Sequence, residues 1–181
     1  GASWPFAVNM MDELRTTDWT LHDEPPASAL SGARIAYGRY KRPLAHVPLS
    51  RLASRYRMKE WAYASCTTPD WLFALAVVQI GFVSQLFAYL VDRRTGAMRQ
   101  VDRLVPLGRG LRFAESSIEG VTRWRSKNVA VDFGFDGGHY VKLDLPLGDE
   151  RLSGELHMLP DESLALLYPL VATSNWLARL C

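Results

Sequence analysis

The residues of this sequence that are best suited to chemistry lie between Lys59 and Gly96, in its longest nearly uncharged stretch. Asp70 is the one acidic residue in the aromatic part of this stretch, where it stands between Pro69 and Trp71. A carboxyl group in apolar surroundings has a raised pKa and can act as a general acid. The simpler role is that of a turn residue that hydrogen-bonds nearby backbone. Asp70 is therefore the one candidate catalytic residue, with the turn role as its alternative.

Aromatic side chains are concentrated in the same stretch, and six of them are candidates for binding a ligand: Trp61, Tyr63, Trp71, Phe73, Phe87 and Tyr89. Aromatic residues bury large areas in protein cores, while Tyr and Trp also carry polar tips that need partners. In a barrel wide enough to leave a cavity, inward-facing residues line a ligand site instead of filling a core. The core role and the ligand role both stay open, and the ligand role predicts an apolar or amphipathic small molecule.

Other catalytic and cofactor chemistries find no support in the sequence. We expect no metal site, because metal-ligand spacing is missing among the four histidines, His22, His46, His139 and His157. Gly108 and Gly110 form a GxG, but the third glycine and the following helix of a dinucleotide site are missing. No phosphate-binding loop occurs either, so we expect no cofactor. Cys66 has no sign of an activating base and is interpreted as a small core residue.

Short antiparallel strands are predicted to position these residues. Trp61, Tyr63 and Thr67 alternate with Ala62 and Cys66, a period-2 pattern that is typical of a strand. Further apolar or alternating runs follow with turn residues between them, at 71–80, 82–91, 98–104, 121–127, 128–135, 140–145 and 152–158. Such a succession predicts an all-β fold, an antiparallel meander that closes into a barrel or packs as a sandwich.

The chain of 181 residues is long enough for one domain, and its 48% apolar and 22% charged residues can build a buried core. Residues 1–33 form an acidic, irregular leader in this interpretation, and residues 34–181 form the folded domain. Residues 34–59 contain several Lys and Arg residues and no Asp or Glu, and tyrosines are interleaved among them. This composition can contact phosphates and stack bases. The alternative is a solvated surface whose charges complement the acidic leader.

Charge and cysteine content limit the partners and the compartment. A net charge of +2 is too small to signal a polyanionic partner for the whole chain. Two cysteines without a disulfide framework indicate a reducing compartment, so we expect a cytoplasmic protein. Residues 71–91 are apolar enough for a membrane helix, but they are rich in β-branched and aromatic residues. We therefore expect strands there and no transmembrane segment.

The C-terminal part changes character. Asp161 could cap a short helix that begins near Glu162, with three leucines on one face, Leu164, Leu167 and Leu170. A strand is the competing prediction from Val171 onward. Residues 171–181 are apolar and lack a polar tail, and such residues normally need cover. We therefore expect this segment to pack against a second chain or a missing C-terminal half.

The central stretch resembles a known family through motifs that occur in a characteristic order: Arg42-Pro43-Leu44, Lys59-Glu60-Trp61-Ala62-Tyr63, Thr68-Pro69-Asp70, Leu72-Phe73-Ala74-Leu75 and Tyr89-Leu90-Val91-Asp92. These motifs resemble the bacterial domain of unknown function 2804, over roughly residues 34–158. The resemblance implies that the chain is the N-terminal part of a longer protein with two halves. It also implies a remote likeness to lipocalin-like proteins, including carotenoid hydratases and stress-linked lipid-binding proteins.

Three functional hypotheses follow from these observations. The first is a lipocalin-like module that binds a lipid-like or isoprenoid-like molecule. The second is a hydratase or isomerase on the same scaffold, in which Asp70 protonates a double bond and the ring of Trp61 or Tyr63 stabilises the cation. The third is weak binding of a polyanion or nucleic acid through residues 34–59. We rank the hypotheses in that order.

Overall fold

The computed structural model describes residues 20–32, 34–47, 59–116, 118–159, 163–170 and 174–180. All regular elements in these ranges are β-strands, fifteen in number, which confirms the all-β prediction. The described residues contain no helix of the length and apolar character that a membrane span requires. The chain divides into two compact units, one with strands β1–β4, β14 and β15 and the other with strands β5–β13.

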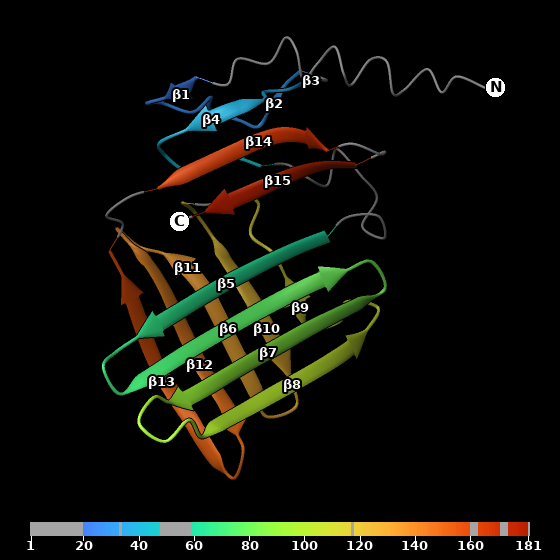
Figure 1. Cartoon of the computed structure of the whole chain (residues 1–181). Helices are drawn as coiled ribbons and strands as arrows, with labels where there is room; N and C mark the ends of the chain where they lie inside the picture. Colours follow the sequence, from blue (N-terminus) through green and yellow to red (C-terminus); the bar gives the residue numbers. More distant parts are fainter. Residues whose placement is uncertain are drawn as a thin grey trace, which may run out of the picture. The chain divides into compact units, whose positions relative to one another are not determined.

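The larger unit contains two antiparallel sheets. The first sheet has the order β5-β6-β7-β8, with bounds Lys59–Thr67, Trp71–Ile80, Val83–Asp92 and Met98–Pro106. The second has the order β13-β12-β11-β10-β9, where β9 to β13 are Leu111–Arg112, Val121–Ser126, Val129–Phe135, His139–Leu147 and Glu150–Met158. In Figure 1 the green strands of the first sheet cross in front of the second. The unit is a sandwich of two separate sheets, and no closed barrel is formed by its described strands.

Alternation along the strands builds the core of this sandwich. In β6 the side chains of Phe73, Leu75 and Val77 point inward, and in β11 those of Val129 and Val131 do the same. Period-2 alternation sends successive side chains to opposite faces of a sheet, so each strand contributes every second residue to the core. The core is completed by residues of β5, β7, β8, β9, β10 and β12, among them Ala64, Leu86, Ala88, Val101, Leu111, Trp124, Val141, Leu143 and Leu145.

A tight turn with an unusual leucine joins β8 to β9. Leu107 and Gly108 both have positive φ, at 60° and 62°, a conformation that two central residues adopt in a type I′ turn and that favours Asn or Gly. The nearby Gly110 also has positive φ, and a Cβ atom there would collide with the carbonyl oxygen of Arg125. The GxG pattern is therefore explained by turn geometry.

Leu107→Asn is expected to raise the free energy of unfolding by about 0.5–1 kcal/mol, because asparagine tolerates the left-handed conformation better than leucine. Asn128 already occupies the other non-glycine position with positive φ among the described residues. The matched control is Leu104→Asn, since Leu104 is similarly exposed but lies in strand β8. Urea unfolding of both variants measures the effect, and a destabilised Leu107→Asn variant would contradict it.

The smaller unit contains a four-stranded sheet with the order β1-β4-β14-β15, whose strands are Leu21–His22, Gly38–Tyr40, Leu164–Leu170 and Ser174–Leu180. The β1–β4 pair is parallel, while the other two pairs are antiparallel. A separate two-stranded ribbon is formed by β2 (Leu30–Ser31) and β3 (Arg34–Ile35). Two of these strands, β1 and β2, fall within the segment that the sequence predicts as an irregular leader, and the predicted domain boundary after residue 33 stays a prediction.

The predicted C-terminal helix is wrong, because residues 164–170 form strand β14. Ala165 and Leu167 are buried, each 1% exposed, while Leu164 and Leu166 are less buried. This alternation is that of a strand, and hydrogen-bonded neighbours on both sides, β4 and β15, supply the pairing. Pro169 lies beyond the three residues of β14 that pair with β4, so its missing N–H removes no hydrogen bond to β4. The predicted cap at Asp161 lies outside the described residues.

Charge pairing links the acidic leader to the basic segment that follows it. Lys41 Nζ lies 2.5 Å from Asp23 Oδ1, and Arg42 Nη1 lies 2.9 Å from Glu24 Oε1. The hydrogen bond and the charge of Lys41 lower the pKa of Asp23. These pairs are the ones expected if the basic residues complement the leader. The rest of the basic segment, residues 48–58, lies outside the described residues.

Candidate ligand-binding face

The outer face of the β5–β8 sheet gathers four of the six aromatic candidates. We call the residues of these strands that point away from the core the aromatic face. In the strand register, Tyr63 of β5 is opposite Ala76 of β6, which is opposite Phe87 of β7. Trp61 lies two residues before Tyr63, and Tyr89 lies two residues after Phe87, so all four side chains share one side of the sheet. Ala76 of β6 separates Tyr63 from Phe87, while Trp61 is opposite Val78.

Large apolar side chains on this face are strongly exposed. Trp61 is 49% exposed, Tyr63 55% and Leu104 64%. Ile80 and Met98 on the same face are also exposed, while Phe87 and Tyr89 are half-buried. An antiparallel sheet normally turns a polar face to water when its other face is packed on a core. Exposed large apolar side chains that gather on one face of a sheet are typical of a binding site.

The remaining two aromatic candidates do not belong to the aromatic face. Phe73 points to the opposite side of the sheet and is a buried member of the sandwich core. Trp71 shares the register of Phe73 but stands at the first position of β6, opposite Asp92, and is 42% exposed. The sequence-based set therefore divides into four residues on one face and two on the other.

Asp70 lies in the turn between β5 and β6, where arginines of the β7–β8 turn hold it. Its Oδ1 accepts a hydrogen bond of 2.7 Å from Arg94 Nε, and its carbonyl oxygen accepts one of 2.8 Å from the Arg93 backbone N–H. Arg93 also donates to the carbonyl oxygen of Thr68. The Asp70 side chain is 45% exposed. These contacts favour the turn role of Asp70 over the role of an acid in apolar surroundings.

Neither Cys66 nor the described histidines form a recognisable catalytic or metal site. The interpretation of Cys66 as a core residue is wrong, because it is exposed near the end of β5, in the inner register but next to the turn. Within the described ranges, no group of three His, Cys, Asp or Glu side chains could hold a metal ion. His157 lies 2.9 Å from a carboxylate oxygen of Glu155 on the outer face of the second sheet.

A polar layer closes one end of the sandwich core, where Glu60 lies in register with the buried Gln79 and Ser84. Gln79 donates to the carbonyl oxygen of Gly81, and the Ser84 hydroxyl donates to backbone carbonyls. Burial raises the pKa of Glu60, and the charge of Glu115 raises it further. Because the folded protein disfavours the ionised form, stability is lost as pH rises from the ordinary value of 4.5 through the raised pKa.

Glu60→Gln is therefore expected to raise the melting temperature at pH 7, where the folded chain must otherwise hold the charge. The difference should disappear below about pH 4, where glutamate is protonated in both states. Melting curves of the chain and the variant across this range measure the effect. Glu119→Gln is the control, because Glu119 is exposed. A Glu60→Gln variant that is less stable at pH 7 would contradict the prediction.

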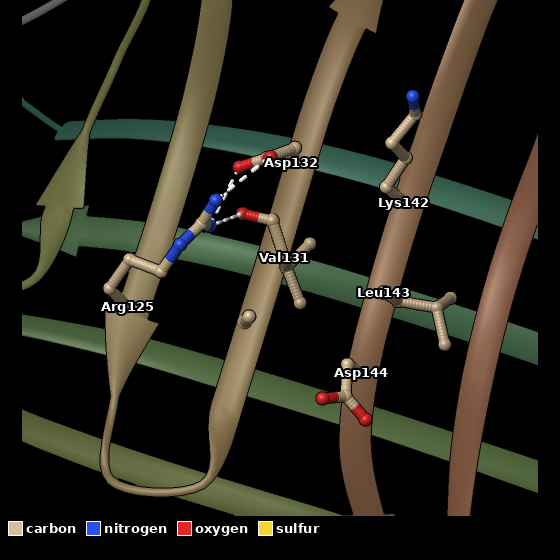
Figure 2. A pocket seen from close by; sticks show the side chains of 7 residues that line it. Arg125, Val131, Asp132, Lys142, Leu143 and Asp144 are labelled. Atoms are coloured by element: carbon tan, nitrogen blue, oxygen red, sulfur yellow. Dashed lines mark hydrogen bonds and ion pairs between the residues drawn. The ribbon is translucent and has the colours of Figure 1, made fainter.

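A shallow open hollow of about 120 Å³ lies on the second sheet of the sandwich and was not anticipated from the sequence. Its charged side chains come from β10, β11 and β12, which are neighbours in the sheet (Figure 2). It is lined by Arg125, Ala130, Val131, Asp132, Lys142, Leu143 and Asp144.

The charged groups around this hollow are already engaged with one another or with neighbours. Arg125 Nη1 donates to the carbonyl oxygens of Trp124 and Val131, and Nη2 donates to Asp132 Oδ2 at 2.8 Å. Asp132 Oδ1 lies 2.7 Å from Nη1 and is ion-paired rather than hydrogen-bonded, because both N–H groups of Nη1 are used elsewhere. Asp144 receives two hydrogen bonds from Arg151, which lower its pKa. These contacts form a cross-strand charge ladder, which has a structural role.

One polar pair on the aromatic face was missed in the sequence. Gln85 Nε2 donates to Asp102 Oδ2 at 2.8 Å, across the β7–β8 pair. Counting outward from the predicted turn at 92–96 would place Phe87 opposite Val101, whereas the actual register places it opposite Asp102, so the carboxylate beside the aromatic residues could not be found this way. Nothing in the local sequence marks Gln85 and Asp102, which lie 17 residues apart, as partners.

Comparisons with known proteins give one match. The model of the family described as Domain of unknown function (DUF2804) matches residues 24–177. No curated protein and no solved structure matches the chain. The matched region includes the strands that carry the aromatic face and both sheets of the sandwich. Since this region makes up most of the 181 residues, the chain belongs to the family Domain of unknown function (DUF2804).

Proposed function

We propose that the protein binds an apolar or amphipathic small molecule, such as a lipid or an isoprenoid-like compound, on the aromatic face. The observation that carries this proposal is the exposure of Trp61, Tyr63 and Leu104 on one side of a sheet whose other side is the sandwich core. Covering such side chains releases about 25 cal/mol for each Å² of apolar surface removed from water. An apolar molecule lying across the strands would supply that cover.

The chemistry of the face supports an amphipathic ligand in particular. Tyr63 and Tyr89 combine an apolar ring with a hydroxyl group, and Trp61 combines an indole ring with one N–H donor. Among the outer positions of β5–β8, only Lys59 and Asp102 are charged. The lipocalin-like relationship and the two-half architecture are parts of the same proposal, as is a cytoplasmic location. The sequence predicts a ligand inside a barrel, whereas in this proposal the ligand lies on the outside of a sheet.

Binding can be tested with decyl maltoside, a neutral amphiphile, below its micelle concentration. Isothermal calorimetry should give a saturable isotherm, and the melting temperature should rise with the concentration of the probe, because a ligand that binds only the folded state stabilises it. Heptyl maltoside serves as the control for chain length and should bind more weakly by about 0.8 kcal/mol for each missing methylene. If decyl maltoside and retinol both give no heat of binding and no shift of the melting temperature, the proposal is overturned.

A further inference from the structure

The Gln85–Asp102 pair gives the aromatic face a local negative charge. Asp102 is exposed on strand β8, and it is the one acidic residue among the outer positions of the four strands β5–β8. Its Oδ2 accepts the hydrogen bond from Gln85 Nε2. A hydrogen bond from an amide N–H to one carboxylate oxygen fixes the orientation of the carboxylate, while the negative charge of the carboxylate remains.

The carboxylate lies in the same cross-strand row as two aromatic rings. Asp102 is opposite Phe87, Phe87 is opposite Ala76, and Ala76 is opposite Tyr63. Directly opposite residues have Cβ atoms about 4.5–5.5 Å apart, so Phe87 is the direct neighbour of the carboxylate. A cation is attracted both by a carboxylate and by the face of an aromatic ring. The row therefore combines two features that favour the same sign of charge.

The nearest basic residue on strand β8 does not neutralise this carboxylate directly. Arg103 follows Asp102 in sequence, but its Nη1 donates to the Asp102 carbonyl oxygen, at 2.9 Å. Its side chain belongs to the opposite register of the strand. The other charged residue of the aromatic face, Lys59, is at the far corner of the sheet, opposite Ile80 at the end of the β5–β6 pair. The charges of the face are thus separated, with the negative one beside Phe87.

We propose that the Gln85–Asp102 pair and the ring of Phe87 bind the cationic head group of an amphipathic ligand, whose apolar part covers Trp61 and Tyr63. This inference rests on the proposed function and adds the chemical class of the ligand, an organic ammonium compound with an apolar chain. An alkylated ammonium group suits the row, because it is attracted to the ring face and is easily desolvated. A compact ammonium group would in addition donate hydrogen bonds to the carboxylate.

Three amphiphiles with the same decyl chain test the inference: decyltrimethylammonium, decyl maltoside and decyl sulfate, each below its micelle concentration. Calorimetry on the intact chain should give the tightest binding for the ammonium compound. Asp102→Asn should weaken decyltrimethylammonium binding about tenfold and leave decyl maltoside binding within about twofold, since only the cation uses the charge. High salt should also weaken the binding of the cation more than that of the neutral compound.

The control variant is Asp149→Asn, which makes the same change in net charge at an exposed turn between β12 and β13. It should leave all three affinities unchanged. Equal binding of the three amphiphiles, unaffected by Asp102→Asn, would overturn the head-group inference while the proposed function stands. Equal losses in the Asp102→Asn and Asp149→Asn variants would also overturn it, because they would indicate an unspecific charge effect. If none of the three amphiphiles binds, the proposed function itself is overturned.

Discussion

Replacing Trp124 with alanine is expected to lower the free energy of unfolding by about 3–5 kcal/mol, because it removes the largest fully buried side chain of the described core. Trp124 is 0% exposed and lies on β10, opposite Val131 of β11 and Leu111 of β9. Its indole Nε1 donates to Ser126 Oγ at 3.0 Å. The substitution would leave a cavity between the two sheets and a hydroxyl group without its donor.

Urea unfolding followed by circular dichroism measures this effect. Trp124→Phe serves as a milder variant that keeps an aromatic ring, with an expected loss of about 1–2 kcal/mol. Trp61→Ala is the control, because Trp61 is half-exposed on the aromatic face and surface substitutions usually change stability by no more than about 0.5 kcal/mol. If Trp124→Ala and Trp61→Ala cost the same, the assignment of the two faces is wrong.

The double variant Trp61→Ala/Tyr63→Ala is expected to bind decyl maltoside at least about tenfold more weakly than the unchanged chain, since it removes two exposed rings that the ligand would cover. The melting temperature without ligand should change little. Phe73→Leu is the matched control on the adjacent strand, because Phe73 lies on the core side of the same sheet. It should lower stability by about 1–2 kcal/mol and keep the affinity.

These two variants separate the core role of the aromatic residues from the ligand role. A calorimetric titration gives the affinity and a melting curve gives the stability of each variant. A double variant that binds normally but melts earlier would assign Trp61 and Tyr63 to the structure instead. A Phe73→Leu variant that stays stable but loses the ligand would place the site on the core side of the sheet.

Local pattern was enough to predict the central strands and, for β5, the division of its residues into two faces. Trp61 and Tyr63 were correctly placed on one side of β5, opposite Ala62 and Ala64, because side-chain direction in a strand depends only on sequence spacing. Which side faces the core depends on the second sheet, which comes from residues more than 40 positions later. For that reason the exposure of Trp61 could not be predicted from the stretch alone.

The error at residues 164–170 has a related cause. Three leucines at intervals of three residues fit one face of a helix, and the same segment also alternates as a strand. The segment forms a strand instead of a helix because it pairs with β4, which lies more than 120 residues earlier in the chain. The proline at position 169 was the local signal against a helix, because it lacks the N–H that a helix interior needs. The Gln85–Asp102 contact was missed for a different reason, because the exact register of the β7–β8 pair depends on the turn that joins the two strands.

The contact between the ligand and Trp61 is the central claim, and fluorescence quenching by a brominated decyl maltoside tests it most directly. Bromine quenches tryptophan emission only at short range, so a bound probe should quench Trp61 and leave the buried Trp124 bright. We predict saturable quenching of the unchanged chain and loss of most of that quenching in Trp61→Phe, whose binding is checked by calorimetry. Undiminished quenching in Trp61→Phe, with binding intact, would contradict the account and place the ligand elsewhere.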